Sequence, residues 1–306
     1  MTEKVVAVTD LTKVYQSHRE EKVAIENISF DVYKGDILAY VGENGAGKST
    51  TIKLILGLMK PSSGVSEVFG RSSFKFRQRN ALKIGTVMGQ KSQLWWELPL
   101  NDSFTFLKKI YGLNLNEANA WLARLIEILH LSEFLNQPVR ELSLGQRMRG
   151  ELVAALIHHP ELLILDEATL GLDVQTKNDL LNFLGHLNRS EHLTIMMTTH
   201  DLREVERIAN RMILLQDGHQ IFSGKINDFL KNYENLKKVE IQETQHILLK
   251  GLNFYQQNND ATVYIFDDQE LSIDTLNQEL ADIDIYNKSI MPLDLSDVLT
   301  IMNGNK

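Results

Sequence analysis

The stretch "VGENGAGKST" (Val41–Thr50) places three glycines and a lysine within ten residues. Glycine costs conformational entropy inside helices and strands, so this density predicts a loop in which bare backbone is needed. The apolar run Ile37–Tyr40 precedes it and predicts a strand. After Lys48, apolar residues recur at Ile52, Ile55, Leu56 and Met59, a spacing typical of a helix. The stretch therefore predicts a tight turn between a strand and a helix.

Within this turn, "GENGAGKS" (Gly42–Ser49) matches the phosphate-binding P-loop pattern Gly-x4-Gly-Lys-Ser/Thr. Such a loop turns its backbone N–H groups toward phosphate, and the helix N-terminus adds partial positive charge. Lys48 can reach the β- and γ-phosphates, and the Ser49 hydroxyl can bind Mg²⁺. The residues predicted to contact the nucleotide here are Gly42, Glu43, Asn44, Gly45, Ala46, Gly47, Lys48, Ser49 and Thr50.

A second acidic motif follows the apolar run Leu162–Leu165, which predicts a buried strand. Asp166 and Glu167 stand at its carboxyl end, the edge of an open α/β sheet where ligands bind. Asp166 can hold Mg²⁺, and Glu167 can activate an attacking water molecule. Taken alone, the two residues could simply be solvated acids at a strand end; the P-loop makes the functional interpretation stronger.

Strands and helices alternate over most of the chain, which predicts a parallel sheet with helices on both faces. A helical block at about 95–160 interrupts this pattern, with Asp102 and Asn116 predicted as helix caps. Beyond it, alternating stretches such as "ATVYIFD" (Ala261–Asp267) predict a small α+β domain. We therefore expect a first domain over 1–236 and a second over 237–306.

Composition narrows the class of protein. The chain has 306 residues and no cysteine, so it has neither disulfides nor thiolate metal sites. Its longest apolar run, Leu152–Ile157, is far shorter than the roughly 20 residues of a membrane-spanning helix, and the first residues show no signal-peptide pattern. The net charge is −8, and residues 237–306 hold five lysines against twelve acids, which argues against nucleic acid as a partner there.

The stretch "RELSLGQRMRGELVAALIHHPELLILDEATLGLD" (Arg140–Asp173) resembles the nucleotide-binding subunits of ATP-binding cassette (ABC) transporters. The family signature Leu-Ser-Gly-Gly-Gln appears here as Leu142–Gln146. Further family positions follow the expected order: the adenine-stacking aromatic, the Q-loop glutamine, the D-loop aspartate and the switch histidine match Tyr15, Gln90, Asp173 and His200. The resemblance covers about residues 5–230. Each position would be weak alone, and their joint order carries the match.

The resemblance implies an α/β P-loop NTPase of the ABC ATPase type, with an inserted helical subdomain and a small C-terminal α+β domain. It implies ATP and Mg²⁺ as cofactors and two cassettes that pair head to tail, as a homodimer or heterodimer. The implied catalytic residues are Glu167 and His200, and Tyr15 would stack on adenine. The implied magnesium residues are Ser49, Gln90 and Asp166, and the residues reaching the partner's nucleotide are Ser143, Gly145, Gln146 and Asp173.

Two positions depart from the family pattern. Leu144 replaces a signature glycine, and Ala168 stands where proline often follows the glutamate. Ser143, Gly145 and Glu167 are retained, so we expect competent hydrolysis.

The resemblance also implies separate permease subunits, which dock near the helical block. Trp95 and Trp96 are adjacent and cannot both face inward from one side, so we expect at least one to be exposed; the alternative is two aromatics packed beneath a loop. The phrases "LSLGQRMR" and "QLWW" resemble the bacterial ABC-2-type exporter branch, which includes drug and viologen exporters. We expect a peripheral position on the cytoplasmic face of the bacterial membrane, and a dimerisation or regulatory role for the C-terminal domain.

Other functions fit less well. A soluble ABC ATPase acting on ribosomes or nucleic acid would carry two cassettes or a long coiled coil, and neither pattern is present. A P-loop kinase or GTPase has no use for the signature or for His200.

The adjacent His158 and His159 would point about 100° apart on a helix, so no transition-metal site is predicted.

Overall fold

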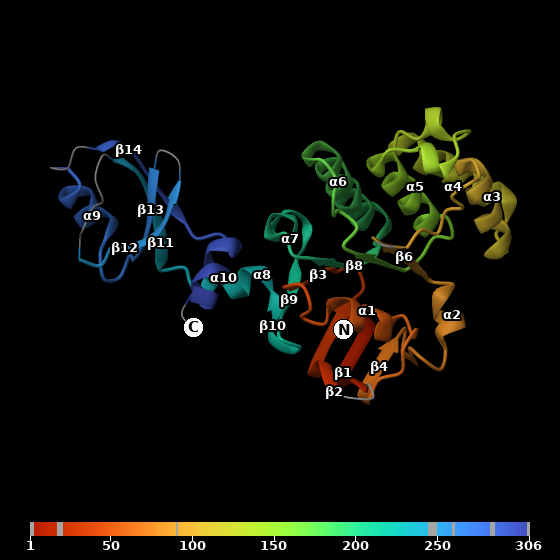
Figure 1. Ribbon diagram of the computed structural model, residues 1–306, viewed down its shortest axis with the longest axis horizontal. Helices are drawn as coiled ribbons and strands as arrows, with labels where there is room; N and C mark the ends of the chain where they lie inside the picture. Colours follow the sequence, from red (N-terminus) through yellow and green to blue (C-terminus); the bar gives the residue numbers. More distant parts are fainter. Residues whose placement is uncertain are drawn as a thin grey trace. The chain divides into compact units, whose positions relative to one another are not determined.

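The computed structural model describes residues 3–16, 21–89, 91–243, 250–258, 261–281 and 285–304 (Figure 1). The chain forms two compact units, Met1–Gly224 and Lys225–Lys306. None of the helices among the described residues is both long and apolar enough to span a membrane.

A six-stranded sheet forms the centre of the first unit. Its strand order is β10 (His219–Lys225), β9 (Arg211–Gln216), β3 (Ile37–Gly42), β8 (Thr194–Thr199), β7 (Leu162–Asp166) and β6 (Ile84–Met88). Strands β9, β3, β8, β7 and β6 pair in parallel. Every residue of β3 and β8 is buried, as expected for parallel strands covered on both faces. The P-loop and the Asp166–Glu167 pair follow β3 and β7, so both lie at the carboxyl edge.

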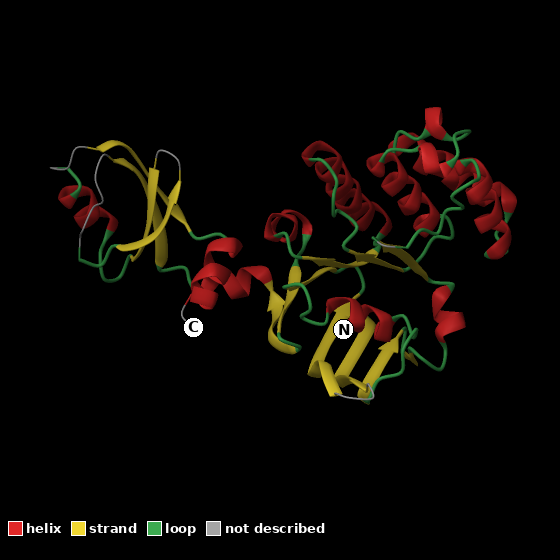
Figure 2. Cartoon of the chain, in the orientation of Figure 1, coloured by secondary structure: helices red, strands yellow, loops and turns green. Residues whose placement is uncertain are grey.

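The two faces of this sheet are covered differently (Figure 2). One carries α3 (Leu100–Ile110), α4 (Leu115–Ile128), α5 (Leu144–Leu156), α6 (Val174–Glu191) and α7 (Leu202–Ile208), with short 3₁₀ turns at Ser132–Phe134 and Val139–Glu141. The other carries α1 (Lys48–Ile55) and a second sheet of order β2-β1-β4-β5. Helices therefore lie on both faces, as expected, and the second face is covered in addition by an antiparallel sheet that the sequence did not predict.

The second sheet consists of β1 (Lys4–Gln16), β2 (Glu21–Tyr33), β4 (Ser63–Val68) and β5 (Arg71–Ser72), all paired antiparallel. A short helix, α2 (Arg77–Ala81), leads from it to β6. Ile25 and Ile28 of β2, Ile52 and Ile55 of α1, and Leu38 of β3 share one buried cluster. The helix that opens at the P-loop is thus held between the two sheets.

Both predicted helix caps in the inserted block are wrong. Helix α3 begins after Pro99, which places Asp102 inside its first turn, where the carboxylate still favours the helix dipole. Helix α4 is capped by Asn114, whose side chain accepts a hydrogen bond from the Asn116 backbone N–H at 3.0 Å. Two asparagines two residues apart are equally suited to this role, and the side chain of the first one makes the bond.

The second unit is an α+β fold. Its antiparallel sheet has the order β12 (Asn253–Asn258), β13 (Ala261–Asp267), β11 (Leu236–Glu243) and β14 (Ile285–Pro292). Its helices are α8 (Ile226–Lys231), α9 (Ile273–Glu279) and α10 (Leu295–Gly304). Val239, Ile241, Tyr264, Phe266 and Leu276 belong to its buried core. Strand β12 was not predicted, because "NFYQQN" lacks a clear apolar alternation.

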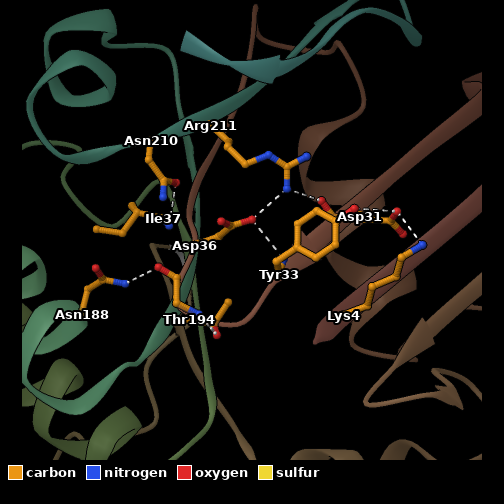
Figure 3. A network of polar contacts seen from close by, with 10 residues as sticks. Lys4, Asp31, Tyr33, Asp36, Ile37, Asn188, Thr194, Asn210 and Arg211 are labelled. Atoms are coloured by element: carbon orange, nitrogen blue, oxygen red, sulfur yellow. Dashed lines mark hydrogen bonds and ion pairs between the residues drawn. The ribbon is translucent and has the colours of Figure 1, made fainter. Parts of the chain in front are cut away.

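A polar network ties the two sheets of the first unit together (Figure 3). Arg211 of β9 donates hydrogen bonds to Asp36 Oδ2 at 2.8 Å and to the Asp31 carbonyl of β2 at 3.0 Å. Asp36, at the start of β3, also accepts a hydrogen bond from the Tyr33 backbone N–H at 3.0 Å. Lys4 pairs with the Asp31 carboxylate at 2.8 Å on the outside of the network. Arg211 thus links β2, β3 and β9.

Replacing Arg211 with alanine should lower the free energy of unfolding by about 2–3 kcal/mol, because the mostly buried Asp36 carboxylate would lose its charged donor. Urea denaturation followed by circular dichroism measures the change. Lys4→Ala is the matched control: it removes a cation of the same network whose side chain is 54% exposed, so its effect should be much smaller. Equal shifts of the two urea midpoints would contradict this assignment.

Candidate active site

The loop between β3 and α1 has the backbone geometry of a phosphate cradle. Gly45 has φ 91° and Gly47 has φ 102°, both in the region that favours glycine. Gly47 is the N-cap of α1, and no side chain caps this helix start. The first N–H groups of α1 therefore point to the loop without a side-chain acceptor, as a bound anion requires.

Lys48 brings a positive charge into this loop. The residue is 5% exposed, and its Nζ donates hydrogen bonds to the carbonyls of Gly42 at 2.7 Å and Glu43 at 3.1 Å. The Glu167 Oε1 lies 3.8 Å from the same nitrogen. The ammonium group is therefore held at the centre of the loop, with an acid at its edge.

A cavity of about 370 Å³ opens beside the loop. Its lining residues are Tyr15, Lys22, Ala24, Asn44, Gly45, Gly47, Lys48, Ser49, Thr50 and Glu167. The Tyr15 side chain stands at the cavity, 39% exposed, with its hydroxyl 3.3 Å from Thr50 Oγ1. An aromatic face at the edge of a phosphate-binding loop is suited to stacking on a base.

A set of oxygen atoms faces the loop from the strand ends. Asp166 Oδ1 accepts hydrogen bonds from Ser49 Oγ at 3.3 Å and from Thr198 Oγ1 at 2.7 Å. Carboxylate and hydroxyl oxygens are the ligands that Mg²⁺ prefers, so Ser49 and Asp166 fit a magnesium site. Gln90, the third predicted magnesium residue, lies outside the described residues.

Glu167 has an unusual backbone for a non-glycine residue. Its φ is 53°, in the sparsely populated left-handed region. Its N–H donates a hydrogen bond to Thr198 Oγ1 at 3.0 Å, which helps to hold this conformation. Glu167 also lines a second cavity of about 70 Å³ together with His200. The predicted catalytic pair therefore shares one small cavity, and Glu167 borders the nucleotide cavity as well.

The four residues predicted to reach a partner's nucleotide lie elsewhere. Ser143 caps α5 in a reciprocal pair with Gln146: its Oγ accepts from the Gln146 N–H at 3.2 Å, and its own N–H donates to Gln146 Oε1 at 2.8 Å. Asp173 caps α6 through the Thr176 N–H at 2.9 Å. A Cβ at Gly145 would lie 3.1 Å from Thr176 Cγ2, so the two helix starts are adjacent. None of the four lines the nucleotide cavity.

The two departures from the family pattern are accommodated differently. Leu144 is 38% exposed, and a Cβ built at Gly171 would lie 3.1 Å from its Cδ2. Ala168 is buried behind Glu167.

Trp95 and Trp96 are 38% and 51% exposed, which confirms that at least one tryptophan reaches the surface. The Trp95 ring lies 5.4 Å from that of Phe106. The Arg147 guanidinium of α5 lies 5.9 Å from the Trp96 ring, and the Arg140 N–H donates to the Trp96 carbonyl at 3.0 Å. The segment that carries Trp95 and Trp96 therefore contacts helix α5 and the residues just before it, which form the signature region.

A buried glutamate also holds the residues that lie just before the two tryptophans. Glu151, a buried residue of α5, accepts hydrogen bonds from the Ser92 hydroxyl and from the Gln93 backbone N–H, the latter at 3.0 Å. Burial raises the pKa of Glu151, while these hydrogen bonds act in the opposite direction.

The adjacent histidines, His158 and His159, pack against aromatic rings. The His158 ring stacks on Tyr111 with centroids 4.0 Å apart, and the His159 ring stacks on Trp121 at 4.4 Å. Burial lowers the pKa of His158 to about 4, so its ring is neutral at physiological pH. Among the described residues, no group of three or more His, Cys, Asp or Glu is arranged to hold a metal ion.

Sequence reasoning missed several residues of the site. Lys22 lines the nucleotide cavity opposite Tyr15 in the β1–β2 pairing, and Thr198 connects Asp166 with Glu167. Thr198 could have been found from the sequence, because it lies at the end of β8, two residues before His200. Lys22 carries no such signal, since only the pairing of two distant strand positions brings it to the cavity.

Comparison with known proteins decides the family. The chain is 30% identical over 269 residues to the bacitracin transport ATP-binding protein BcrA of Bacillus licheniformis, covering 86% of this chain and 85% of that protein. The chain belongs to the ATP-binding proteins of ABC transporters. The protein-family model described as ABC transporter matches residues 25–170. As a member of this family, the chain is an ATPase subunit of a transporter, and these subunits form pairs and work with membrane permease subunits.

Other relatives of this ABC subunit are named for different functions, one for resistance and one for import. It is 32% identical to the linearmycin resistance ATP-binding protein LnrL of Bacillus subtilis, covering 83% of this chain and 81% of that protein. It is also 32% identical to the methionine import ATP-binding protein MetN of Bacillus subtilis, covering 76% and 70%.

Solved structures show the same cassette. An ATP-binding subunit of an ABC transporter is 28% identical, with a TM-score of 0.68, covering 75% of this chain and 93% of that one. A dimeric ATP-binding cassette in a post-hydrolysis state, bound to ADP and phosphate, is 25% identical with a TM-score of 0.65, covering 72% and 98%.

Replacing Gly47 with alanine should destabilise the nucleotide-free protein more than replacing Gly45. Both substitutions force a Cβ into left-handed backbone, at a cost of about 1–2 kcal/mol. At Gly47 the new Cβ would also lie 2.4 Å from Ile25 Cγ2 and 2.5 Å from the Ala24 carbonyl oxygen, whereas nothing lies within 4 Å at Gly45. Thermal melts without nucleotide compare the two variants. Equal melting temperatures would contradict this prediction and show that the chain around Gly47 moves to relieve the clash.

Proposed function

We propose that this chain pairs with a second ATP-binding subunit, binds ATP with Mg²⁺ at the interface, and powers export through separate permease subunits of the ABC-2 type. The observation that carries the proposal is the convergence at the strand ends: Lys48 Nζ lies 3.8 Å from Glu167 Oε1, and Asp166 binds Ser49 directly behind them. One cation, one acid and one oxygen ligand set thus meet at the edge of a 370 Å³ cavity.

Binding would use the loop and its surroundings. The N–H groups of the loop and the Lys48 ammonium would hold the phosphates, and Tyr15 would stack on the adenine. Ser49 and Asp166 would hold Mg²⁺, which neutralises charge on the phosphate oxygens when it is bound. Lys22, which lines the same cavity, adds a second cation close to Tyr15.

Hydrolysis would depend on Glu167 and His200. The Glu167 carboxylate, held at the mouth of the loop by its left-handed backbone, would accept a proton from the attacking water. His200 lines the same small cavity and would contact the γ-phosphate side of that water. These two side chains come from the ends of neighbouring strands, β7 and β8, so their backbone positions are fixed by the sheet.

A second cassette would complete the site. Ser143, Gly145, Gln146 and Asp173 all lie at helix starts outside the nucleotide cavity. Helix starts favour anions, and Ser143 can add a hydroxyl donor. A symmetric pair would bring these groups from one chain to the open side of the other chain's cavity, in the manner of the dimeric cassette that resembles this chain.

Docking to a permease is supported by the exposed surface, and the resemblance to one relative extends beyond the first unit. Trp95 and Trp96 expose aromatic area on the segment attached to α5, and exposed aromatic side chains are frequent anchors of interfaces. The alignment with the bacitracin transport protein spans 269 residues, more than the 224 residues of the first unit, so it includes part of the second. Peripheral attachment at the cytoplasmic face of the membrane follows from such a partnership.

Replacing Glu167 with glutamine should lower the ATPase kcat by at least about a hundredfold, because the amide cannot take a proton from water. ATP affinity should persist, since Lys48 and Ser49 are unchanged. With ATP and Mg²⁺ the variant should therefore accumulate as a dimer, which sedimentation velocity detects. Glu161→Gln is the matched control at the opposite end of β7; it should keep wild-type turnover and show no trapped dimer.

A Glu167→Gln protein that binds ATP and stays monomeric in the presence of its permease would contradict the paired site. The membrane half of the proposal is tested with the same variant in its native host. The trapped dimer should be retained in washed membranes together with a multi-span protein. Recovery with ribosomes, without such a protein, would contradict a transport function.

A further inference from the structure

The turn that carries His200 is held on both sides by one hydrogen-bond network. Thr199, the last residue of β8, is buried, and its Oγ1 accepts a hydrogen bond from the Asp201 N–H at 2.9 Å. The same hydroxyl donates to Glu204 Oε2 at 2.8 Å. The His200 side chain itself is exposed. The network therefore fixes the backbone from which the His200 side chain leaves the turn.

A cation from another helix completes this network. Lys177 Nζ of α6 lies 2.9 Å from Asp201 Oδ2 and 2.9 Å from Glu204 Oε1. Glu204 is 2% exposed, and a carboxylate this deeply buried is strongly destabilised without a charged partner. Burial disfavours the charged form of Lys177, but the two carboxylates outweigh this and raise its pKa. Burial likewise opposes ionisation of Asp201, and Lys177 lowers its pKa.

Lys177 lies one turn into the helix that Asp173 caps. Its backbone N–H donates to the Asp173 carbonyl at 2.9 Å. Lys177 also lines the 70 Å³ cavity, together with Glu167 and His200. A shift of Asp173 at the start of α6 would therefore move Lys177, and with it the carboxylates on either side of the His200 turn.

We propose that Lys177 is a positioning residue for ATP hydrolysis, which holds His200 through Asp201 and Glu204 and makes its position depend on that of Asp173. The inference rests on the proposed function, because it takes His200 as a participant in hydrolysis and Asp173 as a residue at the cassette interface. Lys177 touches neither of the reacting groups directly. It gives each cassette a mechanical link by which contact at Asp173 can align the histidine of the same chain.

The test is the separation of kcat from ATP affinity in the full-length protein. Lys177→Met keeps the length of the side chain and removes its charge. It should lower kcat by about tenfold, equivalent to about 1.4 kcal/mol of transition-state stabilisation. The Kd for ATP, measured by isothermal titration, should change less than about twofold, because the loop is untouched. Lys177→Arg retains the charge and should stay closer to the wild-type kcat than to that of Lys177→Met.

Lys238 offers a matched control in the second unit. Its Nζ also pairs with two carboxylates, Asp294 at 3.0 Å and Asp297 at 2.6 Å. Lys238→Met removes a similar ion-pair network without touching the site, so it should leave kcat unchanged. If Lys177→Met and Lys238→Met gave equal kcat values, or if Lys177→Met weakened ATP binding as much as it lowered kcat, the positioning role would be wrong.

A double variant distinguishes this inference from the function on which it rests. Once His200 is alanine, Lys177→Met should cause no further loss of kcat, since the group it positions is gone. If His200→Ala lowered kcat and Lys177→Met kept the wild-type kcat, only the positioning role would be overturned. A His200→Ala variant with wild-type kcat would overturn the assigned role of His200, and this inference with it.

Discussion

A buried ammonium group is the interaction on which the site depends. Lys48 is 5% exposed, and its hydrogen-bond partners in the loop are the neutral carbonyls of Gly42 and Glu43. A buried charge is costly unless an opposite charge compensates it. Glu167, 3.8 Å away, provides partial compensation. A polyphosphate in the cradle would provide the rest and leave the Glu167 carboxylate available to water.

The signature helix connects this chemistry to the surface proposed for permease docking. Ser143 at the start of α5 faces outward, whereas Arg147 and Glu151 on the same helix hold the segment that contains Trp96. The phrases "LSLGQRMR" and "QLWW", which both indicate the same family branch, are thus in contact in the folded chain. In the proposed function, a force applied at the exposed tryptophans would reach the signature through helix α5.

The sequence was most informative where the functional residues follow one another directly along the chain. Val41–Thr50 predicts the loop and helix α1, and Leu162–Glu167 predicts β7 and its acids, because strand, turn and helix signals are local. The separate antiparallel sheet beneath α1 was not predicted, because the alternation within β1 and β2 indicates strands but not which strands they pair with. Residues recruited by tertiary contact were also missed. Thr198 reaches Asp166 across 32 positions, and Lys177 reaches Asp201 across 24.

The central claim is that each ATP site is built from two chains, and mixing two inactive variants tests it most directly. Lys48→Ala damages the loop side, and Ser143→Arg damages the side offered to the partner. A mixed dimer would hold one site with both defects and one intact site. Equal mixtures should therefore recover about a quarter of the wild-type ATPase rate, given random pairing in a symmetric dimer and independent sites. No recovery on mixing, with mixed dimers shown to form, would contradict the shared site.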